Sequence, residues 1–262
     1  MNLPQIPQIY HLGSLQLHTY GLTFALAVLI AYLLGRKFSK NYGINAQQFD
    51  DIAFWALIIG FVSARIYYVI FYYQYFQNDF WEIFRTWHGG ISIYGGIIGG
   101  AAAIYWIVKK HKLSLLKVLD VFALALPLAQ AVGRIGNYIN HEAFGLPTNL
   151  PWKIFIPVEF RPESYSQYSY FHPTFLYEMI WDIIVFLVVY FFAFKKKQNR
   201  GEKSSEAGFS AAIYLILYSF GRFWIEAIRL DSSYVFGFKL DQIVSILLFA
   251  AGWAILYRKY EA

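Results

Sequence analysis

Arginine, amide and acidic side chains recur at helical spacing within a largely apolar sequence. In the first such segment, Arg134 and Asn137 would share one helical face, and His141 would join them if the helix continued. A guanidinium can bind a phosphate through two parallel hydrogen bonds, and the amides of Asn137 and Asn140 can add neutral donors. Glu142 could hold an arginine in place or accept a proton. This segment therefore indicates an anion-binding site with acid–base chemistry nearby.

A second segment places Arg222, Glu226 and Arg229 at positions i, i+4 and i+7, on one face of a helix. Charged residues inside an apolar segment are costly and mark functional sites by default. Two plainer explanations compete with a functional one. The three residues could form an ion-pair ladder that only fixes helix packing, or arginine ends could snorkel to the lipid headgroups, which would account for Arg229 or Arg65.

A third motif, in residues 87–100, combines His88 and Tyr94 with many glycines. The glycines of its second half follow the small-xxx-small spacing that packs membrane helices together. Bare backbone N–H groups at Gly89 and Gly90 could bind an anion. The motif is therefore interpreted as a packing surface with a possible anion contact at its start.

A fourth motif begins with His172 and Pro173, and proline at a first helical position is a start signal. Glu178 and Asp182 follow, and we expect them to be able to pair with the arginines of the other motifs. A histidine–glutamate metal site would be conceivable here, but the ligand spacing matches no recognisable metal motif. No metal and no cofactor are therefore expected.

Helices that cross a membrane must position these residues. Hydrophobic residues make up 58% of the 262 residues and charged residues 15%, against about 45–50% and about 25% in soluble domains. No basic residues precede the first apolar run, as they would in a cleavable secretory signal, so we expect that run to be retained. The absence of cysteine excludes a disulfide framework, a cysteine nucleophile and a thiolate metal site. Seven apolar runs are recognised, near 18–35, 51–71, 92–108, 118–138, 174–194, 209–229 and 239–257.

The expected fold is an all-α polytopic membrane protein with about seven transmembrane helices. Residues 1–262 are expected to form a single integral-membrane domain. Two longer segments, near 72–91 and 139–173, are rich in Tyr, Phe, Trp and Pro, and we expect them to form caps at the outer face.

Loop charges predict the orientation, because cytoplasmic loops carry an excess of Lys and Arg. Most of the 22 Lys and Arg residues follow the first, third, fifth and seventh runs, whereas few lie on the opposite side. The first group is Arg36, Lys37, Lys40, Lys109, Lys110, Lys112, Lys117, Lys195, Lys196, Lys197, Arg200, Lys203, Arg258 and Lys259, and the second is Arg85, Lys153, Arg161 and Lys239. This distribution places the N-terminus outside and the C-terminus in the cytoplasm, with the polar motifs at the level of the outer leaflet. Topology then accounts for the net charge of +6, and no nucleic-acid partner is expected.

In this order on seven spans, the four motifs resemble the bacterial phosphatidylglycerol–prolipoprotein diacylglyceryl transferases, and the resemblance extends from His18 to Arg229. It implies a transferase of the bacterial inner membrane that moves a diacylglyceryl group from phosphatidylglycerol to the lipobox cysteine in the signal peptide of a prolipoprotein. A thioether forms and glycerol phosphate leaves, which is the first step of lipoprotein maturation. Both substrates are expected to reach the enzyme from within the bilayer.

The resemblance also implies roles for individual residues. The essential arginines match Arg134 and Arg222, and Tyr94 and Glu142 complete the expected catalytic set. Arg134 is also expected to bind substrate, together with Asn137, Asn140, Gly145, Tyr20, Glu226 and His88. Some members carry a histidine where this chain has Tyr94. The proton acceptor stays open between Tyr94, His141, Glu142 and solvent.

Two other classes remain as alternatives. A seven-helix transporter or channel for an organic anion would use the arginines to bind cargo, but it should line a path across the membrane with polar residues. The inner halves of the runs are almost purely apolar, with Asp120 as an exception. A phospholipid headgroup transferase would need an acidic metal-binding motif facing the cytoplasm, and the sequence contains no such motif.

Overall fold

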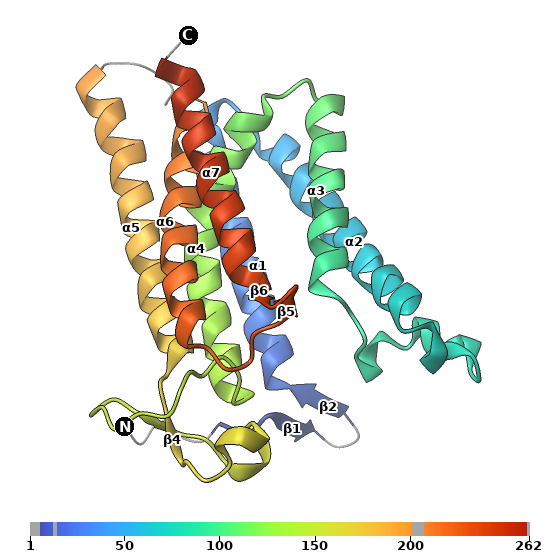
Figure 1. Ribbon diagram of the computed structural model, residues 1–262. Coiled ribbons are helices and arrows are strands. Elements are labelled where there is room, and N and C mark those ends of the chain that lie inside the picture. Colours follow the sequence, from blue (N-terminus) through green and yellow to red (C-terminus); the bar gives the residue numbers. More distant parts are fainter. Residues whose placement is uncertain (1–5, 13–14, 201–206, 261–262) are drawn as a thin grey trace. The chain divides into compact units, whose positions relative to one another are not determined.

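The computed structural model describes the backbone of residues 6–12, 15–200 and 207–260, and the side chains of 6–10, 17–194 and 207–258. Within these residues, seven long α-helices dominate the chain (Figure 1). They are α1 (Thr19–Ser39), α2 (Ala46–Phe71), α3 (Ile93–Lys110), α4 (Leu115–Ile139), α5 (Thr174–Arg200), α6 (Phe209–Ile228) and α7 (Leu240–Tyr260). The expected all-α class and all seven helices are confirmed.

Six of the described helices are long and apolar enough to cross a membrane. The remaining one, α3, has 18 residues and is rich in glycine. The basic side chains expected after the fifth run, from Lys195 to Lys203, lie outside the described side chains, as does Lys259.

In the described residues, three two-stranded antiparallel sheets and six short 3-10 helices accompany the α-helices. The strands are β1 (Ile9–Leu12) with β2 (Leu15–His18), β3 (Ile154–Phe155) with β4 (Tyr170–Phe171), and β5 (Tyr234–Val235) with β6 (Phe238–Lys239). The 3-10 helices are η1 (Lys40–Tyr42), η2 (Tyr73–Phe76), η3 (Phe80–Phe84), η4 (Thr86–His88), η5 (Val158–Phe160) and η6 (Glu163–Tyr165).

Internal contacts divide the chain into two compact units, Met1–Gly35 with Leu119–Ala262, and Arg36–Val118. In the first unit, α4 is the central helix. Half of its most apolar window is buried, against 11–28% in the other candidate spans. The Tyr214 hydroxyl of α6 donates to Gln130 of α4 at 3.0 Å. A Cβ on Gly136 would lie 2.9 Å from the Tyr20 ring, so glycine lets α4 approach α1 closely. A Cβ added at Gly133, the neighbouring glycine of the same motif, would meet nothing within 4 Å, so this glycine does not serve close packing.

Asp120, which lies on α4, caps the N-terminus of α6. Its wholly buried carboxylate accepts hydrogen bonds from the Gly208 and Ala211 N–H groups at 2.6 and 2.8 Å. These donors have no partner within their own helix, and a negative charge is favoured at a helix N-terminus. Asp120 was the exception among the apolar inner halves of the runs. Its role as a helix cap explains it, so it does not indicate a polar path across the membrane.

The connection between α4 and α5 packs around a small core formed by Ala143, Phe144, Ile154, Ile156, Phe171 and Phe175. It lies at the end of the first unit where α4 ends and α5 begins (Figure 1). Its backbone is tied to the end of α6, since the Leu146 N–H donates to the Ile228 carbonyl and the Leu230 N–H to the Phe144 carbonyl. This connection thereby fixes the polar end of α4 against the polar end of α6.

In the second unit, α2 packs against α3 along the glycine face of α3. A Cβ on Gly95 would lie 2.5 Å from the Ser63 carbonyl, and one on Gly99 would lie 2.2 Å from the Ser63 hydroxyl. The interpretation of these glycines as packing residues is confirmed.

Arg65 is also structural. Its buried guanidinium donates to the carbonyls of Glu82, Ile83, Gly89 and Gly90 at 2.5–2.8 Å. Snorkelling is thus the wrong explanation for Arg65, which fastens the segment between α2 and α3.

Candidate active site

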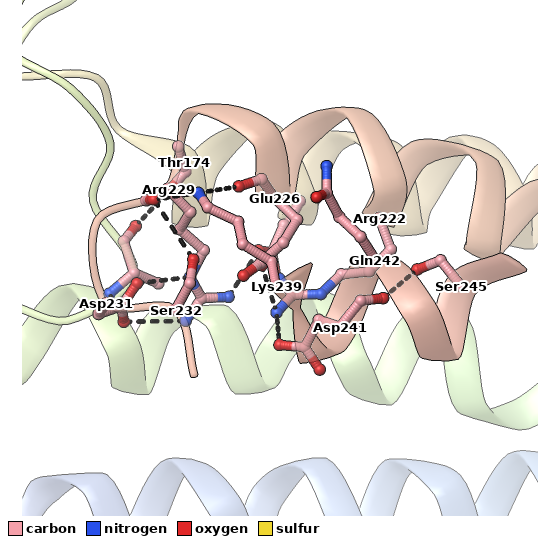
Figure 2. Close-up of polar contacts among 12 residues, drawn as sticks. Thr174, Arg222, Glu226, Arg229, Asp231, Ser232, Lys239, Asp241, Gln242 and Ser245 are labelled. Carbon is pink, nitrogen blue, oxygen red and sulfur yellow. Dashed lines mark hydrogen bonds and ion pairs between the residues drawn. The ribbon is translucent and has the colours of Figure 1, made fainter. Parts of the chain in front are cut away.

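Arginines and carboxylates from four helices meet in the first unit, in what we call the charge cluster. Its members are Arg134 of α4, Glu178 and Asp182 of α5, Arg222 and Glu226 of α6, Arg229 and Asp231 of the following loop, and Asp241 of α7. Figure 2 shows its part around α6 and the start of α7. The two arginine motifs, which are far apart in the sequence, therefore form one site.

Glu178 is the centre of the cluster. Its Oε2 lies 2.7 Å from Arg134 Nη2, while its Oε1 contacts Arg222 and lies 2.9 Å from Arg229 Nη1. Its side chain is only 4% exposed. Asp182, one turn further along α5, lies 3.8 Å from Arg134 Nε. The expected pairing of Glu178 and Asp182 with the arginines is confirmed, and Glu178 holds all three guanidiniums in one place.

Arg222 is almost surrounded by acids. Besides Glu178, its Nη2 lies 2.9 Å from Glu226 Oε2 and 2.6 Å from Asp241 Oδ2. Glu226 is wholly buried one helical turn away, as the ion-pair ladder would require. A buried arginine held in this way has a fixed orientation, which suits it to bind a planar or tetrahedral anion.

Arg229 joins the cluster to the loop after α6. Its Nε and Nη2 pair with the two oxygens of Asp231 at 2.6 and 2.9 Å, and the same carboxylate accepts from the Ala143 N–H at 3.1 Å. Burial alone would raise the pKa of Asp231, but the hydrogen bond and the charge of Arg229 outweigh it and lower the pKa. Snorkelling is therefore the wrong explanation for Arg229, because its guanidinium is enclosed by protein partners.

Lys239 closes the same end of α6. Its ammonium donates to the carbonyls of Glu226 and Arg229 at 2.7 Å each (Figure 2). These carbonyls end the helix, and a cation is favoured there. Burial lowers the pKa of Lys239, and the neighbouring acids only partly offset that effect.

A chain of amide contacts extends from Arg134. Its Nη1 donates to Asn137 Oδ1 at 3.4 Å, and the Asn137 amide donates to one oxygen of Glu142 at 3.3 Å. The Asn140 amide donates to the other oxygen at 3.2 Å. Four expected site residues thus lie together, and within the described part of the chain Glu142 accepts from the two amides and forms no ion pair with an arginine.

Gly145 lies where three backbone segments meet. Its N–H donates to the His172 carbonyl at 2.8 Å, and a Cβ there would lie 2.8 Å from the Ile228 carbonyl. A larger residue would therefore push α6 away from the α4–α5 connection. This contact gives Gly145 a steric role beside any contact with substrate.

His141 does not continue the polar face of α4. The helix ends at Ile139, and His141 turns away with a φ of +56°. Its ring lies 4.7 Å from that of Phe160 and lines a cavity of about 620 Å³ that Glu159 also lines. Burial lowers the pKa of His141, although Glu159 acts in the opposite direction.

Tyr94 and His88 belong to the second unit. Tyr94 lies in the first turn of α3, 43% exposed, and His88 Nδ1 lies 2.7 Å from Glu82 Oε1. The Gly89 N–H donates to the Thr86 carbonyl, so the expected anion contact at Gly89 is wrong.

Sequence reasoning assigned no site role to Asp231, Lys239 or Asp241. The pairing of Asp231 could have been predicted from the sequence, because an acid two residues after Arg229 can contact that arginine at a helix end. Asp241 and Lys239 begin the next apolar run, and only the packing of α7 on α6 brings them to Arg222 and to the end of α6.

Fold and site together define a polytopic membrane protein with a buried cluster of arginines and carboxylates. The family model described as prolipoprotein diacylglyceryl transferase matches residues 7–258. A phosphatidylglycerol–prolipoprotein diacylglyceryl transferase of Fervidobacterium nodosum is 44% identical over 247 residues, which cover 94% of this chain and 82% of that protein. Relatives of the same name from Thermotoga maritima and a Synechocystis species are 42% and 41% identical, over 94% and 95% of this chain and 82% and 87% of their own lengths. The chain therefore belongs to the prolipoprotein diacylglyceryl transferase family.

Proposed function

We propose that the protein transfers the diacylglyceryl group of phosphatidylglycerol to the cysteine thiol of a prolipoprotein lipobox. Membership of the family and the names of its relatives support this activity. The observation that carries it here is that Arg134 and Arg222, from separate helices, converge on the single carboxylate of Glu178. Two arginines that can share one carboxylate can also share one phosphate. The comparisons give no support to an organic-anion transporter.

In the proposed reaction, the cysteine sulfur attacks the glyceryl carbon that bears the phosphate. A carbon–sulfur bond forms, the carbon–oxygen bond breaks, and its electron pair leaves on glycerol phosphate. Arg134 and Arg222 stabilise the charge that develops on the phosphate, because charged donors fixed in a buried site act without reorganisation. Their positive field also favours the thiolate. The thiol proton goes to Tyr94, His141, Glu142 or solvent.

The remaining residues are proposed to hold the lipid headgroup and the arginines. Asn137 and Asn140 orient Glu142, and Glu226 orients Arg222. Tyr20, whose ring packs on Gly136, and His88 are proposed to contact substrate, and Gly145 to shape the site.

A transfer assay tests the function directly. Purified protein would be incubated with radiolabelled phosphatidylglycerol and a lipobox peptide, with a cysteine-to-serine peptide as the control. Label bound to the cysteine through a thioether supports the proposal. Binding of phosphatidylglycerol without any labelled peptide would instead favour a lipid-binding or transport role.

The site is proposed to face the outer leaflet of the bacterial inner membrane. Reporter fusions after Lys40, Lys112 and Lys197 should report the cytoplasm, whereas fusions near Gln77 and Ser166 should report the outside. The reason is the concentration of basic residues in the first set of loops. A cytoplasmic signal near Ser166 would move the charge cluster to the opposite leaflet and contradict the orientation.

Tyr94 is proposed as a catalytic position that accepts histidine. An unperturbed tyrosine has a pKa of about 10, which is too high for a good base near neutral pH. Tyr94→His should remain active because some members of the family carry histidine at this position, and Tyr94→Phe should retain measurable transfer if the tyrosine only orients lipid. Comparing the pH–rate profiles of both variants with that of the parent reports whether this position titrates during catalysis. A folded but inactive Tyr94→His enzyme would show that this site works differently from its histidine-bearing relatives.

A further inference from the structure

Three carboxylates contact Arg222, and they differ in how firmly each one is held. The side chains of Glu178 and Glu226 are 4% and 0% exposed, whereas that of Asp241 is 43% exposed. All three are close enough to neutralise the guanidinium. A lipid phosphate that is to bind Nη1 or Nη2 of Arg222 must therefore displace at least one of them.

The two buried acids are poor candidates for displacement. Glu178 also pairs with Arg134 and Arg229, so moving it would leave two other buried guanidiniums short of a partner. Glu226 lies on the same helix as Arg222 and has no exposed surface through which it could reach water. Moving a buried charge away from its partner is strongly unfavourable.

Asp241 is held differently. It lies in the first turn of α7 and reaches Arg222 Nη2 at 2.6 Å. Figure 2 shows it at the edge of the cluster, approaching Arg222 from the α7 side. Among the described residues, Arg222 is its one cationic partner. Because its side chain is 43% exposed, it can turn away from Arg222 without crossing the protein interior, and we expect that movement to cost little, as for an exposed ion pair.

We propose that Asp241 is the exchangeable counterion of Arg222. It occupies Nη2 while the site is empty, yields that position to the phosphate of the lipid, and returns as glycerol phosphate departs. This inference rests on the proposed function, because it requires a phosphate to bind Arg222. Asp241 does not touch the reacting carbon, so it acts as a positioning residue through Arg222.

The exchange has a specific consequence for turnover. The substrate phosphate is a diester with one negative charge, whereas the leaving glycerol phosphate is a monoester that approaches two at neutral pH. The product therefore attracts the arginines more strongly than the substrate does. A carboxylate that competes for Arg222 weakens product binding and speeds release.

Asp241→Asn removes the competing charge while keeping a side chain suited to the start of a helix. Affinity for glycerol phosphate, measured by titration calorimetry on the detergent-solubilised full chain, should rise roughly two- to five-fold, the range set by a half-exposed ion pair. In the transfer assay, KM for phosphatidylglycerol should fall and glycerol phosphate should inhibit more strongly, without any gain in kcat. Asp241→Glu should behave like the parent.

The matched control is Glu163→Gln, which removes the same charge from an exposed position in the same unit. It should leave phosphate affinity unchanged. Unchanged or weaker affinity in folded Asp241→Asn would overturn the proposal, and Asp241→Ser repeats the test if asparagine disturbs the fold. Absence of transfer by the parent enzyme would refute the proposed function instead, while the binding comparison would still decide whether Asp241 competes with phosphate.

Discussion

Arg134→Lys and Arg222→Lys should each reduce diacylglyceryl transfer by about 10- to 150-fold. Lysine keeps the positive charge but loses the planar group that can make two parallel hydrogen bonds. One lost charge-assisted hydrogen bond corresponds to roughly 1.5–3 kcal/mol, which gives that range if the contact is made in the transition state. Initial rates at saturating phosphatidylglycerol measure the effect.

Arg36→Lys is the matched control for this substitution. Arg36 forms a half-exposed ion pair with Asp50, at 2.9 Å, far from the charge cluster in sequence and outside both arginine motifs. Such pairs contribute about 0–1 kcal/mol, so this variant should keep full transfer. Wild-type rates for either cluster variant would refute the catalytic assignment of that arginine.

Alanine variants need a second substitution to be interpreted. Arg222→Ala leaves Glu178 and Glu226 without one of their cations, and breaking a buried pair in this way costs roughly 3–5 kcal/mol. Adding Glu226→Ala removes part of that cost. Recovery of both stability and transfer in the double variant would make Arg222 structural, whereas a folded and inactive double variant supports its role at the phosphate.

Glu178→Gln should strongly destabilise the protein, although it changes only one atom of the side chain from oxygen to nitrogen. An amide keeps the shape of the side chain, but it removes the one negative charge that three buried guanidiniums share. We expect a loss of about 3–5 kcal/mol in the free energy of unfolding and almost complete loss of transfer. Thermal unfolding in detergent and the transfer assay measure the two effects.

The control for Glu178 is again Glu163→Gln, which is expected to change stability by less than about 0.5 kcal/mol. If Glu178→Gln instead kept the stability and rate of the parent enzyme, the arginines would be held by other contacts, and Glu178 would not be the centre of the cluster. Phosphatidylglycerol should raise the unfolding temperature of the parent more than that of the variant, because a bound ligand stabilises only a site that can still form.

The helices and the types of residue in the site could be predicted from the sequence alone. A run of about 20 apolar residues can satisfy its backbone in lipid only as a helix, so hydropathy along the chain determines each span. The spacing of Arg222 and Glu226 already implied their ion pair, which lies within one helix. The motifs also identified the family, since their order along the chain does not depend on packing.

Only the tertiary structure determined which ion pairs and hydrogen bonds the charged groups form. Arg65 is an arginine within an apolar run, as Arg134 and Arg222 are, but its guanidinium donates to the carbonyls of a neighbouring loop. Glu178 became the shared partner of three arginines, and Asp241 reached Arg222, because α5 and α7 both pack against α6. Such contacts join residues that are far apart in the sequence, so no local periodicity encodes them. The physical reason is that a buried charge must find an opposite charge, and helix packing determines which one lies within reach.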